Sequence, residues 1–172
     1  MSIILGINAY HPDSSAALLV DGKPIAAIAE ERLNRIKHYA GFPHLAVNAC
    51  LQVAGLTWKD VDVLSIGSDR LANRFRKAMY SLGHPRLITN FNKILRRKNS
   101  VNDLHNLISA NCNEPLENLR FKVMPVEHHL AHIASAYFAS PWENAAGISV
   151  DGSGDFVTCM MSICQGSDIF VK

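Results

Sequence analysis

The sequence predicts an α/β fold whose mixed sheet begins with an antiparallel meander and is flanked by helices. Three strand signals come first, over residues 3–9, 16–20 and 25–29, and Asp21-Gly22 stands between the second and the third. An Asp-Gly pair between two apolar runs is a strong hairpin signal. A helical pattern and a fourth strand signal follow, so we expect the fourth strand to lie parallel to the first after a helical crossover.

The first helix is predicted over residues 43–54. Apolar residues recur there at helical spacing, at Val47, Cys50, Leu51 and Ala54. Pro43 suits the first turn of a helix, and Gly55 suits its C-cap. The fourth strand is predicted over residues 61–66, where the pattern alternates before Gly67-Ser68.

The second half of the chain predicts another helix between strands. Residues 121–126 form a strand signal that runs directly into a histidine-rich helix, which should end before Pro141. Strands are expected over 145–150 and 156–163, and a further strand begins at 169 after a turn. Because that last strand needs a partner to satisfy its backbone, we expect the 172 residues to be part of a longer protein.

Residues 71–118 have the weakest pattern and contain a basic cluster on expected helices. Its members are Arg74, Arg76, Lys77, Arg86, Lys93, Arg96, Arg97 and Lys98. We interpret the cluster as a solvated helical surface. Contact with a partner domain is the second interpretation, and nucleic acid is the third because no reader motif accompanies the charges.

Length and composition favour one globular domain. Of the 172 residues, 48% are hydrophobic, and the net charge is only +2. This balance gives no general argument for nucleic acid or an anionic membrane as a partner. No apolar run approaches the roughly 20 residues that span a bilayer. The N-terminus does not resemble a signal peptide, and the four cysteines lack a CxxC pairing. We therefore expect a cytoplasmic protein with reduced thiols.

The histidine-rich helix offers metal ligands. His128 and His132 are four residues apart and share one face of a helix, whereas His129 lies about 100° away around the axis. Asp151, at a strand end, is the candidate third ligand. Two imidazoles and a carboxylate suit iron, zinc or manganese. The alternative is a surface helix with hydrogen-bonded histidines. A metalloprotease is disfavoured because no glutamate stands between the ligands as in HExxH.

Two polar segments are candidate phosphate loops. In the predicted turn Asp151-Gly152-Ser153-Gly154-Asp155, glycines permit positive φ and let backbone N–H groups approach phosphate oxygens. In His11-Pro12-Asp13-Ser14-Ser15, hydroxyl and carboxylate groups are candidates to bind phosphate or metal-bound water, and His11 is a candidate general base. Ordinary hairpin loops remain the alternative for both segments.

A charge run follows the third strand, over residues 30–37. If it lines a cleft, Arg32, Arg35 and Lys37 are placed to meet an anionic substrate, with Glu30 orienting them. The alternative is a solvated face.

Four segments in order resemble the N-terminal part of the O-carbamoyltransferase family, whose members act on nodulation factors, cephem antibiotics, novobiocin-type compounds and aminoglycosides. The segments are Leu5-Gly6-Ile7-Asn8 through His11-Pro12-Asp13-Ser14-Ser15-Ala16-Ala17-Leu18, Glu30-Glu31-Arg32-Leu33 with Lys37 and Phe42-Pro43, Glu127-His128-His129-Leu130-Ala131-His132, and Asp151-Gly152-Ser153-Gly154-Asp155. The resemblance extends over nearly the whole chain except about 70–118.

The resemblance implies an actin-like ATPase domain (ASKHA, ribonuclease H-like) related to the tRNA threonylcarbamoyl-adenosine synthases. Residues 1–172 would be its first half, without the second half and without a YrdC-like C-terminal domain. The family pattern implies Fe(II) or another divalent metal on His128, His132 and Asp151, and ATP with Mg in the cleft. The residues that the resemblance and the loops assign to nucleotide, phosphate or carbamoyl binding are Ser14, Ser15, Gly152, Ser153, Gly154, Arg32 and Lys37.

The implied reaction activates carbamoyl phosphate with ATP to carbamoyladenylate and transfers the carbamoyl group to a hydroxyl of a sugar or natural product, as in nodulation or antibiotic biosynthesis. We assign His11 as the base and Asp13 as its orienting or acceptor-binding partner, with His129 as a rival catalytic residue. The expected partners are carbamoyl phosphate, ATP, a hydroxyl-bearing acceptor and the missing C-terminal part, with neither nucleic acid nor membrane and with a homodimer possible. Residues 1–172 alone should have little activity.

Two other functions remain open. One is a different actin-like kinase or ATPase, which would use magnesium and would not need the HxxxH pair. The other is a non-catalytic metal- or nucleotide-binding module acting through the basic cluster, which would leave the four motifs unexplained.

Overall fold

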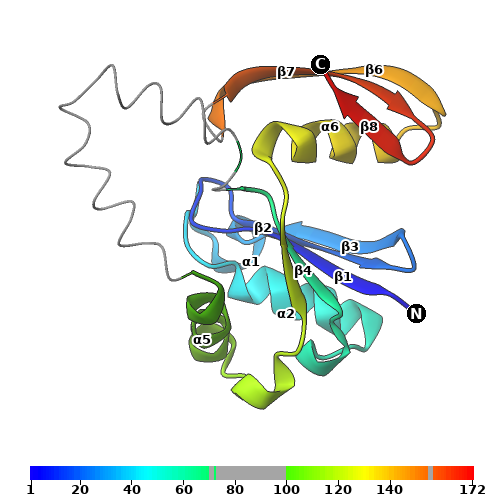
Figure 1. Ribbon diagram of the computed structural model, residues 1–172. Helices are drawn as coiled ribbons and strands as arrows, with labels where there is room; N and C mark the ends of the chain where they lie inside the picture. Colours follow the sequence, from blue (N-terminus) through cyan, green and yellow to red (C-terminus); the bar gives the residue numbers. More distant parts are fainter. Residues whose placement is uncertain (70–71, 73–99, 155–156) are drawn as a thin grey trace. The chain divides into compact units, whose positions relative to one another are not determined.

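The computed structural model describes residues 1–69, 72, 100–154 and 157–172, which belong to two compact units (Figure 1). Unit 1 consists of the described residues within 1–66 and 94–124. Unit 2 consists of the described residues within 67–93 and 125–172. The basic cluster between Arg74 and Lys98 lies outside the described residues.

Unit 1 is built on a five-stranded mixed sheet of order β3-β2-β1-β4-β5. Its strands are β1 (Ile3–Asn8), β2 (Ser15–Val20), β3 (Lys23–Ala29), β4 (Val63–Ile66) and β5 (Lys122–Pro125). The first three strands are antiparallel neighbours, and β4 pairs with β1 in parallel, with Leu5 opposite both Leu18 and Leu64. The predicted meander and the predicted parallel fourth strand are therefore confirmed.

Helices of unit 1 flank this sheet. They are α1 (Glu31–Asn34), α2 (His44–Ala54), the 3-10 turn η1 (Trp58–Asp60), α5 (Ser100–Cys112) and the 3-10 turn η3 (Leu116–Asn118). The predicted helix 43–54 is confirmed, and Gly55 ends it at φ +66°, where glycine carries no steric cost. Alternate β1 residues such as Leu5 are buried in one core with Val47 and Cys50 of α2.

Unit 2 contains α6 (His128–Phe138) and a three-stranded antiparallel sheet of order β6-β7-β8. The strands are β6 (Asn144–Gly154), β7 (Val157–Gln165) and β8 (Asp168–Val171). Helix α6 packs on β6 and β7 (Figure 1). Its Ile133 and Tyr137 are buried against Cys164. The predicted histidine-rich helix ending before Pro141 is confirmed, and so is the strand pair after it.

The glycine-rich segment after Val150 differs from the prediction. Instead of a turn that begins at Asp151, β6 continues through Gly154, which pairs with Val157 after a register irregularity. Gly152 does not adopt a positive φ. Small residues permit such an irregularity inside a strand. Because Gly152 stays in the strand, the left-handed backbone expected for a phosphate loop does not form there. Residues 155–156 lie outside the described part.

None of the described helices has both the length and the apolar character needed to cross a bilayer. All four cysteines, Cys50, Cys112, Cys159 and Cys164, lie in the described part of the chain and carry free thiols. The α/β class with a helix-flanked mixed sheet is thus confirmed, while the cytoplasmic location stays a prediction.

Candidate metal centre

The start of α6 is fixed by the side chain of Glu127. As the N-cap residue, it accepts a hydrogen bond at 2.7 Å from the backbone N–H of Leu130 through Oε2. A capping carboxylate satisfies an otherwise unpaired amide and interacts favourably with the helix dipole. The first helical residue is then His128, and His132 follows one turn later on the same face.

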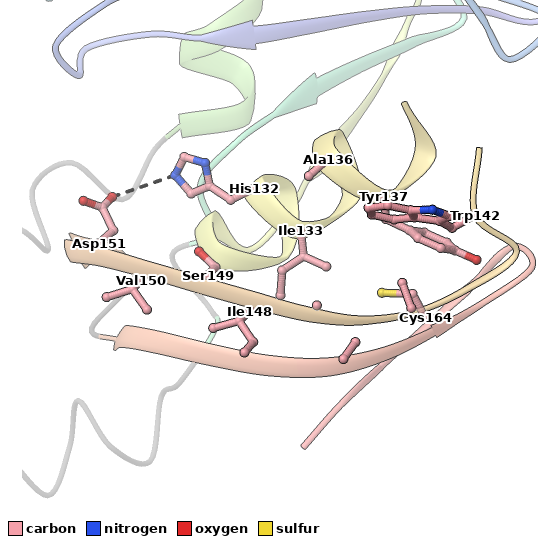
Figure 2. Close-up of a pocket in the computed structure, with 13 residues that line it drawn as sticks. His132, Ile133, Ala136, Tyr137, Trp142, Ile148, Ser149, Val150, Asp151 and Cys164 are labelled. Carbon is pink, nitrogen blue, oxygen red and sulfur yellow. Dashed lines mark ion pairs between the residues drawn. The ribbon is translucent and has the colours of Figure 1, made fainter. Parts of the chain in front are cut away.

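Helix α6 and strand β6 bring the three predicted ligands together. Nε2 of His128 lies 2.8 Å from Oδ2 of Asp151 and 3.1 Å from Nε2 of His132. Nε2 of His132 lies 3.8 Å from the same Asp151 oxygen (Figure 2). One ligand atom from each residue falls within 4.8 Å of the others, a separation compatible with one bound ion.

The electrostatics of this cluster favour an ionised carboxylate. The pKa of Asp151 is lowered first by the hydrogen bond from His128, then by the Gly152 backbone N–H, and further by the charges of the two histidines. The side chains of His132 and Asp151 are 55% and 42% exposed, so additional ligands can reach the centre. Two imidazole nitrogens and one carboxylate oxygen suit a first-row divalent metal such as iron, zinc or manganese.

His129 is fully buried beside this cluster, and both of its ring nitrogens have other partners. Its Nε2 donates to the carbonyl of Val157, and its Nδ1 accepts from the Ser149 hydroxyl, both at 2.8 Å. With both nitrogens used inside the unit, His129 joins α6 to β6 and β7. The structure therefore gives His129 a structural position, in place of the rival catalytic role inferred from the sequence.

The loop between β1 and β2 arranges its polar residues differently from the prediction. Ser14 is buried, and its hydroxyl bonds to the carbonyls of Gly41 at 2.8 Å and His11 at 3.2 Å, so its oxygen holds the loop and is not presented to phosphate. Asp13 is exposed, and its Oδ1 lies 3.0 Å from Nδ1 of His38. His38 is thus the partner that Asp13 meets. Ser15 sits half-buried in β2.

In the charge run over residues 30–37, Glu30 is buried, whereas Arg32 and Lys37 are exposed. Glu30 is fully buried, and its carboxylate accepts from the backbone N–H groups of Leu45 at 3.2 Å and Ala46 at 2.7 Å. It therefore stabilises the N-terminus of α2 and does not orient the neighbouring cations. Lys37 pairs instead with Glu31 at 3.2 Å, while Arg32 is exposed.

The described part of unit 2 also contains a pocket of about 540 Å³ beside the cluster. Its lining runs along α6 from His132 to Tyr137 and along β6 from Ala145 to Asp151, with Trp142 near the far end (Figure 2). Two candidate ligands, His132 and Asp151, belong to this lining. The metal cluster is therefore continuous with this pocket.

A sequence model of the carbamoyltransferase N-terminus matches residues 3–172. The chain belongs to the carbamoyltransferase family. It is 34% identical over 175 residues to the uncharacterized protein sll1178 of Synechocystis sp., an alignment that covers 98% of this chain and 28% of that protein. It is 29% identical over 164 residues to the nodulation protein NolNO of Sinorhizobium fredii, which covers 94% of this chain and 22% of NolNO. The chain thus spans about a quarter of the length of these relatives.

Among solved structures, YeaZ from Pseudomonas aeruginosa aligns with all of this carbamoyltransferase-family chain and with 65% of its own length, at 16% identity and a TM-score of 0.49. The actin-like type of the fold stays a prediction.

The glycine-rich segment of this carbamoyltransferase-family chain contacts the metal cluster through Gly152, whose backbone N–H donates to Oδ1 of Asp151. Gly152 has open space around its Cα, and Gly154 lies in β6, while the side chain of Ser153 lies outside the described residues. His11 is exposed in unit 1. Sequence reasoning missed His38 and the buried role of Glu30, because neither residue belongs to a pattern of fixed spacing with its partner.

Proposed function

We propose that this chain supplies the metal-binding N-terminal part of an ATP- and carbamoyl-phosphate-dependent O-carbamoyltransferase. In this proposal, carbamoyl phosphate is activated as carbamoyladenylate, and the carbamoyl group passes to a hydroxyl of a sugar or natural product. The observation that carries the proposal is the convergence of His128, His132 and Asp151 in a chain of the carbamoyltransferase family.

The donor set supports a resident divalent metal. When bound by His128, His132 and Asp151, such an ion would act as a Lewis acid that holds phosphate oxygens and offsets charge on the leaving group. The hydrogen bonds to Asp151 keep its carboxylate ionised and orient it before an ion arrives. The buried His129 fixes the helix that carries both imidazoles.

Residues of unit 1 have separate proposed tasks. His11 is proposed to remove the proton of the acceptor hydroxyl. Asp13 is proposed to bind the acceptor or to position a base, with His38 as the imidazole that it contacts. Arg32 and Lys37 are proposed to bind phosphate or the carbamoyl group. To do so, Lys37 would leave its ion pair with Glu31, which is weak because the lysine is exposed to solvent.

Metal analysis of the purified chain tests the ligand assignment. We expect about one equivalent of a divalent metal in the parent chain and a loss of at least tenfold in metal affinity in His132→Ala and Asp151→Ala. His44→Asn is the matched control, because His44 lies in α2 of unit 1 and contacts Glu30. Unchanged metal content in both ligand variants, measured on chains with native circular dichroism, would rule out this site.

Carbamoyl transfer is tested by substituting this chain for the N-terminal region of a full-length family member such as NolNO. We expect transfer to depend on both ATP and carbamoyl phosphate, and to fall at least 100-fold with His132→Ala but to persist with His44→Asn. A metal-loaded, folded chimera that hydrolyses ATP without using carbamoyl phosphate would instead support a different nucleotide-dependent activity.

A further inference from the structure

A second group of candidate metal ligands lies in unit 1. Its members are Asp13, Glu31 and His38. One ligand atom from each residue lies within 4.8 Å of the others, as in the cluster that contains Asp151. Because His38 contributes an imidazole, the group combines nitrogen and oxygen ligands and differs from a patch of acidic side chains.

Hydrogen bonds of Ser14 join the two segments that carry Asp13 and His38. The backbone N–H of Ser14 donates to the carbonyl of Tyr39 at 2.9 Å, and the Ser14 hydroxyl donates to the carbonyl of Gly41 at 2.8 Å. Ser14 is buried and directly follows Asp13. Tyr39 directly follows His38. The main chain therefore holds two ligand residues together that are 25 positions apart in the sequence.

The side chains of Asp13 and His38 are already in contact. Oδ1 of Asp13 lies 3.0 Å from Nδ1 of His38, a contact of the same kind as the one between Asp151 and His128. When Nδ1 of an imidazole binds a metal, the ring can carry its proton on Nε2. The side chains of His38 and Asp13 are 77% and 61% exposed, so an ion can enter and water can complete its coordination.

Glu31 supplies a carboxylate that two donors hold in place. Its Oε2 accepts the backbone N–H of His38 at 3.1 Å, and its Oε1 accepts from Nζ of Lys37 at 3.2 Å. These bonds lower the pKa of Glu31, the one from His38 most, so the carboxylate is ionised at neutral pH. The Glu31 side chain is 15% exposed and that of Lys37 is 80% exposed. The lysine can therefore turn into solvent while the carboxylate stays beside His38.

We propose that Asp13, Glu31 and His38 form a second metal site, which takes a divalent transition metal such as Zn²⁺. One imidazole nitrogen and two carboxylate oxygens suit such an ion, and water fills its remaining positions. The ion offsets the negative charges of the two carboxylates, which otherwise repel each other. All three ligands belong to unit 1, so this site depends neither on the cluster at His132 nor on the proposed carbamoyl transfer.

A zinc titration of the parent chain, followed through the NMR signals of the imidazole nitrogens, tests this proposal. We expect the signal of Nδ1 of His38 to shift as Zn²⁺ is added, separately from the signals of His128 and His132. The spectrum of His38→Asn identifies the ring. Asparagine suits the left-handed backbone of His38, at φ +53°, so this change preserves the turn.

The contribution of each ligand is measured in a background that lacks the two imidazoles of the other cluster, His128→Ala with His132→Ala. In that background, the dissociation constant for Zn²⁺ should rise at least tenfold with each of three further changes, which are His38→Asn, Asp13→Asn and Glu31→Gln. Asp13 also has a left-handed backbone, at φ +63°, which asparagine tolerates.

Two variants repeat these substitutions elsewhere in unit 1 and serve as matched controls. His44→Asn changes an imidazole at the start of α2, and Glu117→Gln changes an exposed carboxylate in η3. Each should alter the dissociation constant for Zn²⁺ less than twofold.

Several outcomes would overturn the proposal. They are a His38 signal that does not respond to Zn²⁺, an affinity that is unchanged in all three ligand variants, and a dissociation constant above about 1 mM, which would mean an adventitious ion only. If the background or a ligand variant fails to fold, the remaining variants and the His38 signal of the parent chain decide. A response of His38 without any response of His128 and His132 would support this site and contradict the metal centre of the proposed function.

Discussion

Nδ1 of His129 lies 2.8 Å from the hydroxyl oxygen of Ser149, inside the unit that carries the candidate metal ligands. Both residues are buried, and Nε2 of the same ring donates to the Val157 carbonyl. This pattern assigns the proton to Nε2 and makes the Ser149 hydroxyl the donor to Nδ1. The ring connects α6 to both neighbouring strands.

Removal of the hydroxyl should therefore destabilise unit 2. In Ser149→Ala, Nδ1 of His129 loses its buried donor, and the free energy of unfolding should fall by about 1–3 kcal/mol. Urea denaturation followed by circular dichroism measures the change. Ser167→Ala, in the exposed turn between β7 and β8, is the control and should stay within about 0.5 kcal/mol of the parent chain. Equal stability of both variants would show that the hydrogen bond contributes nothing.

Glu30→Gln should destabilise unit 1. The buried Glu30 carboxylate accepts two backbone amides at the start of α2, and the neutral amide side chain can replace only one of these acceptors. We expect a loss of about 1–3 kcal/mol in the free energy of unfolding. Glu117→Gln, at an exposed acidic residue in η3, is the matched substitution and should have little effect. Similar midpoints in urea would contradict the capping role.

Gly147→Ala should disturb the contact between α6 and the sheet. A Cβ at Gly147 would approach the Ser162 hydroxyl oxygen and lie 2.7 Å from Cγ2 of Ile133. Ile133 is buried and β-branched, so its side chain cannot move away easily. Overpacking of this kind costs about 1–3 kcal/mol. Gly152→Ala serves as the comparison, because a Cβ there meets nothing within 4 Å. A melting temperature that fell equally in both variants would argue against this close approach.

Asp60→Asn should reduce the sensitivity of the chain to acid. The pKa of Asp60 is lowered mainly by its hydrogen bonds from the Thr57 hydroxyl and backbone N–H. Because the folded-state pKa lies below the unfolded value, this carboxylate stabilises the fold above its usual pKa of 3.8, and the contribution is lost as the pH falls through the lower folded-state value. Stability measured from pH 5 to 2 should therefore decline less steeply in Asp60→Asn. Parallel pH profiles would contradict this.

Thiol labelling should distinguish the cysteines at pH 8. Burial raises the pKa of Cys112 to about 11, so very little reactive thiolate is present there, whereas Cys159 is exposed on β7. Iodoacetamide followed by peptide mass analysis should modify Cys159 at least tenfold faster than Cys112. Labelling in urea should remove the difference. Comparable rates in the folded chain would show that the Cys112 region opens readily.

Much of the secondary structure could be predicted because its causes are local. The Asp21-Gly22 pair ends one strand and starts the next, with Gly22 at φ +76°. Gly55 ends α2 for a similar reason. The i, i+4 spacing of His128 and His132 also sets their common face once the helix forms. These features depend on backbone preferences and periodicity within a few residues.

The hydrogen-bond partners of several polar side chains could not be predicted in this way. Glu30 accepts a hydrogen bond from Ala46 at the start of α2, and Asp13 contacts His38, whereas the partner predicted from the sequence is His11. These partners are 16 and 25 residues apart, and no repeating pattern relates them. Burial then determines their roles, because a polar group removed from water must find a hydrogen-bond partner wherever the packing supplies one.

In the histidine-rich helix α6, the shared face of two histidines follows from local spacing, whereas their contacts follow from tertiary packing. The sequence alone determined that His128 and His132 share a face that excludes His129, because the helical period places them there. Only the tertiary structure decided that Asp151 extends β6 to meet the pair and that His129 is buried against Ser149. Helical spacing is a property of the local backbone, whereas the contacts of each face depend on how α6 packs against a strand about 20 residues later.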